Sequence, residues 1–236
     1  MLDFDFSMAF QPIIDVSSKR IFAHEALVRG IAGEPAGTVF EKVHDGNRYR
    51  FDQTCRSKAI KLAAELEMDT FLSINFMPNA IYKPELCIRT TLAAAETYHF
   101  PLDRIIFEFT ESEKIDDIEH LREIVDYYNE CGFSTAIDDF GAGYAGLNLL
   151  AEIQTDIVKL DMALIRNIDR RKASRAIVKG VIQVCEELDT RLIAEGIESE
   201  QELMVLQDMG IELFQGFYFA QPMFEQLANI PFNPGH

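Results

Sequence analysis

Acidic and amide side chains interrupt several otherwise apolar runs of this sequence. Asp138 and Asp139 stand side by side after Ala136 and Ile137 and lead directly into a glycine-rich segment. Adjacent carboxylates repel each other, so this placement implies a partner of opposite charge. Similar polar side chains lie at or near the ends of other apolar runs: Glu25, Asn75, Glu108, Lys159, Glu195 and Gln215. Carboxylate and amide oxygens are the ligands that hard divalent cations prefer.

The chemistry that such a set could perform is hydrolysis of a phosphate ester. Asp138 and Asp139 could reach two cations, and two metal ions about 3.5–4 Å apart are a recurring device for displacement at phosphorus. The set contains no histidine, which disfavours zinc and favours Mg²⁺ or Mn²⁺. Lys159 could orient the attacking water or stabilise charge on the phosphoryl oxygens. Two other interpretations stay open, namely a polar network without metal and an ion pair between Lys159 and Asp161.

The elements that must position these residues alternate between short strands and longer helical patterns. Apolar runs typical of strands cover residues 8–14, 23–29, 71–76, 104–110, 134–140, 156–161, 191–196 and 213–219. Apolar residues at three-to-four spacing predict helices over 52–68, 116–130 and 172–188. Eight strands alternating with helices in 236 residues fit an α/β fold, a (β/α)8 barrel of the TIM type, better than an open sheet. The carboxyl ends of barrel strands converge on one rim, so the polar residues should meet there.

The first two strands depart from this repeat. Only residues 15–20 separate them, and this segment has the composition of a tight turn. A parallel crossover needs about a dozen residues or more, so the connection should be a hairpin. We therefore expect an antiparallel first strand in an otherwise parallel barrel.

Composition narrows the class of protein. The chain has 39 Asp and Glu against 22 Lys and Arg, a net charge of -17, which argues against binding a nucleic acid polymer. Its four cysteines form no C-x-x-C pair and are expected to be reduced core residues. No apolar run is long enough for a membrane span, and the N-terminus is acidic where a signal peptide is basic. We expect a cytoplasmic protein without membrane contact, folded as a single domain over residues 1–236.

Eight short motifs follow one another through nearly the whole chain. They are FQPIID, EALVR (25–29), SINF, FEFTES, IDDFGAGYAGL, VKLD, AEGIES and QGFYFAQP, and they span residues 10–222. Together, and in this order, they resemble the EAL-domain family of cyclic di-GMP phosphodiesterases. The departures are minor, since Ala145 and Gly146 stand where serines are frequent and Ser199 stands where threonine is usual.

The resemblance implies a reaction and a set of residue roles. The reaction is hydrolysis of cyclic di-GMP to linear pGpG in bacterial second-messenger signalling, with two Mg²⁺ or Mn²⁺ ions per site. Ca²⁺ is expected to permit substrate binding and to inhibit cleavage. Glu111 is implied to anchor the loop after the paired aspartates. The implied metal ligands are Glu25, Asn75, Glu108, Asp138 and Asp139; the catalytic residues are Glu25, Lys159 and Glu195; and the substrate contacts are Gln11, Leu27, Arg29 and Gln215.

Some alternatives stay open from the sequence. Certain family members have lost catalysis and act as cyclic di-GMP receptors, although the complete motif set here favours an enzyme. The pair His44–Asp45 resembles the HD pair of another class of phosphohydrolase, but the remaining histidines are scattered. The resemblance also implies a homodimer through the region after the DDFG loop, with a short helix near 144–151. Whether residues 140–147 are ordered without ligand does not follow from the sequence.

Overall fold

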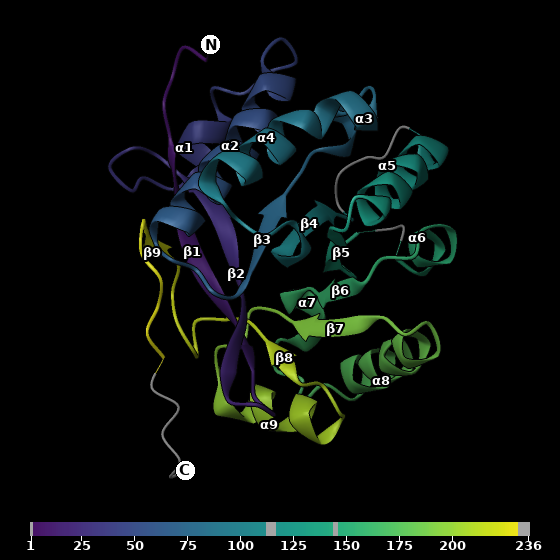
Figure 1. Ribbon diagram of the computed structural model, residues 1–236. Coiled ribbons are helices and arrows are strands. Elements are labelled where there is room, and N and C mark those ends of the chain that lie inside the picture. Colours follow the sequence, from purple (N-terminus) through teal and green to yellow (C-terminus); the bar gives the residue numbers. More distant parts are fainter. Residues whose placement is uncertain (1, 112–116, 144–145, 231–236) are drawn as a thin grey trace.

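The strands form a closed barrel. The computed structural model describes residues 2–111, 117–143 and 146–230. Each barrel strand pairs with the next one along the chain from β2 to β8, and β1 closes the barrel by pairing with both β8 and β2 (Figure 1). The strands are β1 (Ser7–Asp15), β2 (Arg20–Arg29), β3 (Phe71–Asn75), β4 (Ile105–Thr110), β5 (Ser134–Phe140), β6 (Ile157–Leu160), β7 (Arg191–Ala194) and β8 (Leu213–Phe214). The predicted (β/α)8 barrel is confirmed.

The first strand is antiparallel to both of its barrel neighbours, as expected. It pairs with β2 from Ser7 opposite Arg29 to Asp15 opposite Arg20. The Asp15 side chain accepts hydrogen bonds from the backbone N–H groups of Ser17 and Ser18, at 2.9 and 3.1 Å. This local bonding stabilises the tight turn and explains why the short connection makes a hairpin.

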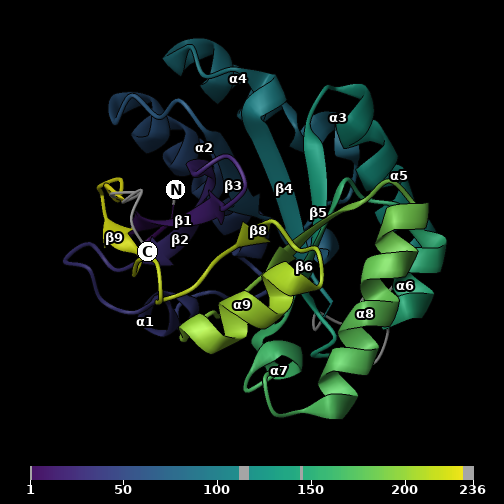
Figure 2. The same cartoon turned by 90° about the horizontal axis from the view of Figure 1, so that it is seen from below.

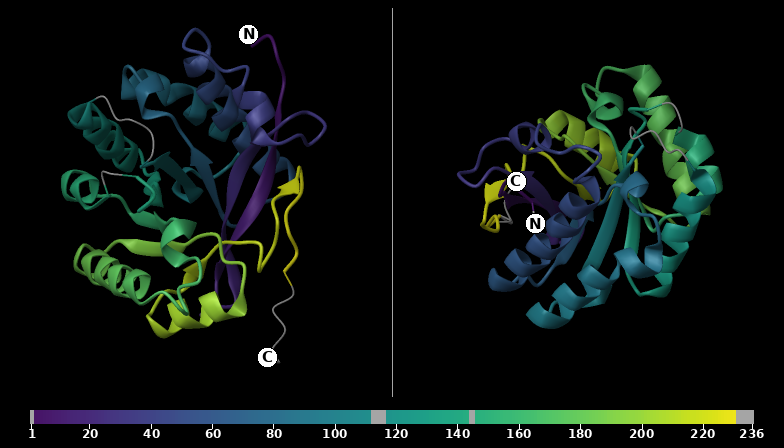
Figure 3. Two further views of the ribbon diagram at one scale, coloured as in Figure 1. Left: turned by 180° about the vertical axis from the view of Figure 1, so that it is seen from behind. Right: turned by 90° about the horizontal axis from the view of Figure 1, so that it is seen from above.

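Helices cover the outside of the barrel (Figures 2 and 3). Asp117 caps α5 by accepting from the His120 N–H, and the helix buries Leu121, Ile124, Val125 and Tyr128 at the spacing of one helical face. None of the helices within the described residues is long and apolar enough to cross a membrane. The helices are α1 (Ala36–Phe40), α2 (Arg48–Glu65), α3 (Pro84–Cys87), α4 (Arg89–Tyr98), α5 (Ile118–Glu130), α6 (Gly146–Glu152), α7 (Met162–Ile165), α8 (Lys172–Glu187) and α9 (Glu200–Asp208), with 3₁₀ turns at η1 (Pro78–Ala80) and η2 (Leu102–Arg104).

The end of the chain differs most from the predicted strands. The expected strand over 213–219 ends at Phe214, because the chain then turns and the Tyr218 N–H donates to the Ile197 carbonyl. Gly216 lies so close to that backbone that a Cβ atom would stand 2.2 Å from the Ile197 oxygen. A short strand β9 (Met223–Phe224), which the sequence did not predict, pairs with β1.

The barrel interior explains how the polar residues reach one rim. A small apolar cluster fills the end of the barrel where the parallel strands begin: Ile13, Ala23, Ile106, Ala136, Ile157, Ile193 and Leu213. On six of the parallel strands, the residue two positions further along the chain is a site candidate. Because side chains on a strand alternate with a period of two, both residues face inward. These candidates are Glu25, Glu108, Asp138, Lys159, Glu195 and Gln215.

Candidate metal centre at the carboxyl rim of the barrel

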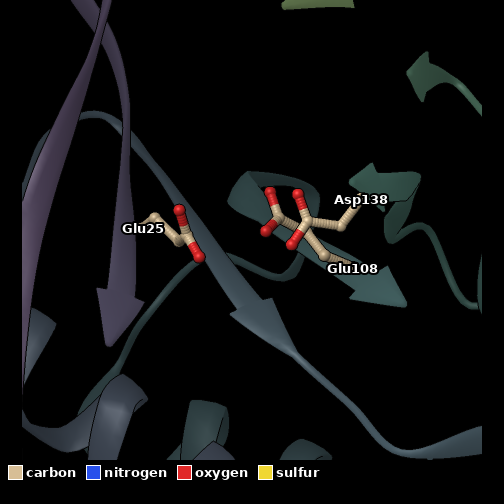
Figure 4. Close-up of side chains that lie close together, drawn as sticks. All are labelled: Glu25, Glu108 and Asp138. Atoms are coloured by element: carbon tan, nitrogen blue, oxygen red, sulfur yellow. The ribbon is translucent and has the colours of Figure 1, made fainter. Parts of the chain in front are cut away.

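The structure brings acids from the ends of four strands, β2, β4, β5 and β7, together at the carboxyl rim. Carboxylate oxygens of Glu25, Glu108 and Asp138 lie within 4.8 Å of one another. A second group within the same distance consists of Asp138, Asp139 and Glu195, so Asp138 belongs to both. Figure 4 shows the first group, in which side chains from β2, β4 and β5 extend into a common space. Two neighbouring cations would need a shared ligand of this kind, and Asp138 could supply it.

A bulge in β5 explains how two adjacent aspartates face the same space. In a regular strand, neighbouring side chains point to opposite faces of the sheet. The pairing of β5 with β6 shifts between Ile137 and Phe140, and Asp139 has a left-handed backbone with φ of 55°. The Thr110 hydroxyl donates to Asp139 Oδ2 at 3.1 Å, which fixes the second carboxylate. The strained backbone therefore serves to place both acids at the rim.

Lys159 lies in the middle of the acids and is fully buried. Its Nζ atom lies 2.7 Å from Glu195, 2.8 Å from Glu108, 2.9 Å from Asp138 and 3.3 Å from Glu25. Burial alone would lower its pKa, but the surrounding carboxylates outweigh burial and raise the pKa of Lys159 well above its usual value. The ammonium group thus supplies positive charge to the cluster.

The alternative pairing of Lys159 with Asp161 does not occur. Among described residues, the ion pairs of Lys159 are with the four acids of the rim. Asp161 instead caps α7, where its Oδ1 atom accepts from the Ala163 N–H at 2.7 Å. This capping arrangement fits the usual preference for aspartate at a helix N-terminus.

Amide side chains orient Glu25 from both sides. Gln215 Nε2 donates to Glu25 Oε2 at 2.8 Å and to Gln11 Oε1 at 3.2 Å, and Asn75 Nδ2 donates to Glu25 Oε1 at 2.9 Å. Gln11 Nε2 in turn donates to the Ala220 carbonyl at 3.2 Å. Both oxygens of this glutamate are therefore held by named donors.

The remaining acids carry more negative charge than one lysine can offset. Burial, with the nearby charges of Glu25 and Asp138, raises the pKa of Glu108 to about 8, although Lys159 opposes the shift. Burial also raises the pKa of Glu195 well above its usual value, and the neighbouring Asp138 adds to this. The Oε1 atom of Glu108 is buried without a hydrogen-bond partner. An unpartnered carboxylate oxygen among other carboxylates and an amide fits a hard divalent cation.

Glu111 holds both sides of the loop that follows the paired aspartates. It is buried, and its two carboxylate oxygens accept from the N–H groups of Gly141 and Gly146, each at 2.6 Å. Gly141 has φ of +95°, and a Cβ atom there would lie 2.3 Å from the Leu164 side chain. Of the loop 140–147, whose order the sequence left open, Tyr144 and Ala145 lie outside the described residues.

Two cavities flank the cluster, and both reach Glu25 and Asp138. One of about 370 Å³ extends past Gln11, Glu195 and Gln215 to Phe217. The other, of about 340 Å³, is more apolar and is lined by Leu27, Arg29 and Asn75 among others. With divalent cations held by the carboxylates, this geometry suits an elongated ligand with a central anionic group and two outer lobes.

Sequence reasoning missed part of the first cavity. Phe217 and Met162 line it and are 58% and 45% exposed. Phe217 was not among the residues expected to contact the substrate, although it follows Gln215 by only two positions. That spacing within QGFYF was the signal that could have located it.

Comparison with known proteins identifies the family. Residues 3–222 match the EAL domain. The chain belongs to the EAL-domain family. It is 34% identical over 223 residues to the blue light- and temperature-regulated antirepressor BluF of Escherichia coli K12. The matched residues cover 94% of this chain and 55% of BluF. It is 29% identical over 225 residues to the cyclic di-GMP phosphodiesterase PdeB of Shewanella oneidensis, covering 90% of this chain and 26% of PdeB. The chain thus spans about half or less of these curated relatives.

Solved structures share the fold over the full barrel. A standalone EAL protein of Vibrio cholerae O395, in a form bound to c-di-GMP, is 54% identical with a TM-score of 0.95, covering 100% of this chain and 98% of that one. A manganese and cyclic di-GMP complex of BlrP1 from Klebsiella pneumoniae is 33% identical with a TM-score of 0.91, covering 98% of this chain and 59% of that one. A calcium and cyclic di-GMP complex of BlrP1 is also similar, with a TM-score of 0.87, 35% identity, and coverage of 95% and 57%.

Proposed function

We propose that this protein hydrolyses cyclic di-GMP to linear pGpG with the help of two divalent cations, Mg²⁺ or Mn²⁺. The observation that carries the proposal is the rim itself, where two groups of carboxylates share Asp138 between two cavities. Family membership and similarity to proteins named cyclic di-GMP phosphodiesterases support the choice of substrate. A two-lobed substrate with its phosphate over the acids matches the two cavities.

Residues at the rim would either hold a cation or contact the substrate in this proposal. Glu25, Asn75, Glu108 and Asp138 would hold one cation, and Asp138 with Asp139 would hold the second. Such ions, when bound, neutralise the phosphate and make water a better nucleophile. Gln11, Leu27, Arg29 and Gln215 would contact the substrate, since each lines one of the cavities. Arg29 is suited to a phosphate oxygen.

The chemical step breaks one ester bond of the ring. Water attacks one phosphorus, the P–O3′ bond breaks, and the 3′ oxygen takes up a proton from solvent water and leaves as a hydroxyl. Lys159 lies within 2.9 Å of three rim carboxylates and would stabilise the charge that develops on the phosphoryl oxygens. Glu195 would accept the proton of the attacking water, because it faces Asp138 and Asp139 across the same space.

One assay separates this enzyme from a receptor of the same fold. Purified protein is incubated with cyclic di-GMP and Mg²⁺ or Mn²⁺, and the products are separated by chromatography. We expect pGpG from the wild type and none after chelation of the metal or from Glu25→Ala. Tight binding without any linear product would instead establish a non-catalytic receptor, a possibility raised by the antirepressor role in the name of BluF.

A further inference from the structure

A buried ion pair lies behind the metal centre, between α2 and the barrel. Asp52 and Arg56 stand one turn apart on α2, and Arg56 Nη2 lies 2.8 Å from Asp52 Oδ2. Their side chains are 1% and 0% exposed. Removing two charges from water costs several kcal/mol per ion before their attraction is counted. Because such a pair often adds little net stability, its contacts with the barrel are the better guide to its role.

Asp52 connects α2 to the end of β3. The carboxylate oxygen that does not face Arg56, Oδ1, accepts from the Met77 N–H at 3.0 Å. Met77 follows Asn75 by two residues, and the Phe76 N–H between them donates to the Glu108 carbonyl at 2.8 Å. The backbone just after Asn75 is therefore fixed on one side by β4 and on the other by Asp52.

Arg56 fixes the rings that neighbour the candidate ligands. Its guanidinium carbon lies 5.6 Å from the ring centre of Phe76 and 5.0 Å from that of Phe107. These two residues directly follow Asn75 and directly precede Glu108 in the chain. Because neighbouring side chains on a strand point to opposite faces, holding the rings outside the barrel restricts the ligands inside it.

We propose that Asp52 and Arg56 are positioning residues that set the orientation of Asn75 and Glu108 toward a divalent cation. The inference rests on the proposed function, which assigns those two residues as ligands. Neither Asp52 nor Arg56 touches the cation; they act through the backbone of Met77 and the rings of Phe76 and Phe107. Supporting groups of this kind typically change metal affinity by about 10- to 100-fold when they are removed.

The test compares Mn²⁺ affinity with stability in the absence of substrate. The double variant Asp52→Leu with Arg56→Met removes both charges and keeps the site apolar, a replacement that other proteins often tolerate without loss of stability. It leaves the Met77 N–H without its acceptor. Tyr128→Phe is the matched control, because it deletes the 2.7 Å hydrogen bond between Arg56 Nη1 and the Tyr128 hydroxyl but leaves the Asp52 contact with Met77.

We expect the double variant to bind Mn²⁺ about tenfold or more weakly by calorimetry, while the melting temperature of the metal-free protein falls by no more than about 10 °C, the cost of the one lost hydrogen bond. Tyr128→Phe should bind within about twofold of wild type. Should the double variant not fold, Arg56→Lys keeps the ion pair but loses the planar packing, and its Mn²⁺ dissociation constant should rise by at least about threefold. Wild-type affinity in a folded variant would overturn the positioning role alone. A wild-type protein that binds no Mn²⁺ would overturn the proposed function and this inference together.

Discussion

Replacing Glu111 with glutamine tests how the loop after the paired aspartates is held. The two oxygens of Glu111 accept from Gly141 and Gly146 at 2.6 Å each. A glutamine retains one acceptor oxygen but turns an NH₂ group toward the other N–H, so at least one of the two hydrogen bonds must be lost. Glu111→Ala should lose both. Glu111→Gln is therefore much more disruptive than the similar size of the two side chains suggests.

The magnitude follows from the kind of bond that is removed. A hydrogen bond to a charged group contributes about 1.5–3 kcal/mol, and about 1.4 kcal/mol corresponds to a tenfold change in an opening equilibrium. Amide hydrogen exchange at the glycine that loses its acceptor should therefore become about 10- to 150-fold faster. Activity should also fall, because Asp139 lies only two residues before Gly141.

The assay is hydrogen exchange of Gly141 and Gly146 measured by NMR. Glu34→Gln is the matched control, since Glu34 is an exposed loop residue whose Oε2 atom accepts from the Ala32 N–H at 2.9 Å. The control should leave exchange at the two glycines unchanged. Wild-type exchange rates at both glycines in Glu111→Gln would refute the anchoring role.

Four further predictions concern other parts of the molecule. Lys159→Met removes the cation from the cluster, so Mn²⁺ should bind at least about tenfold more tightly while turnover falls; weaker Mn²⁺ binding would contradict this electrostatic account. Burial lowers the pKa of His24 to about 4, so the folded state resists its protonation and loses stability as the pH falls below about 6.5. His24→Asn keeps a hydrogen-bonding group toward Thr70, whose Oγ1 atom lies 2.9 Å from Nδ1, and should reduce the loss of unfolding free energy between pH 7 and pH 5 by about 2 kcal/mol. An equal loss of unfolding free energy in the variant and the wild type would argue against it. Replacing Mn²⁺ with Ca²⁺ should preserve cyclic di-GMP binding and slow cleavage at least about tenfold, and equal rates would exclude the proposed coordination. The family resemblance implies a homodimer through the region after the DDFG loop, where Leu147 in α6 is 59% exposed. In such a dimer Leu147→Asp should give a monomer in light scattering, and a monomeric wild type would exclude this interface.

Much of the site could be predicted because its residues follow the period of two. Six of the parallel strands carry an apolar interior residue followed two positions later by a polar one, as in Ile157 and Lys159. Once the strands were assigned to a barrel, their common rim followed from topology. The hairpin between β1 and β2 was equally predictable from the short connection, Asp15 to Arg20.

Other features depend on contacts that no local pattern records. The bulge at Asp139 is a change of register between β5 and β6, and sequence alternation alone would have separated the two aspartates. The contact between Asp52 and the Met77 N–H joins segments 25 residues apart, so only the fold reveals it. The strand β9 has two residues, too few to carry a periodic signal.

In the proposed reaction, water cleaves cyclic di-GMP at this carboxylate rim with metal present. The most direct measurement is a single-turnover reaction in ¹⁸O-labelled water with Mn²⁺, followed by mass spectrometry of the linear product. Wild-type protein should give pGpG with one ¹⁸O atom in its 5′-phosphate, and Glu25→Ala or the chelated protein should give no product. Unlabelled product, or equal cleavage by the Glu25→Ala variant or by the chelated protein, would contradict it.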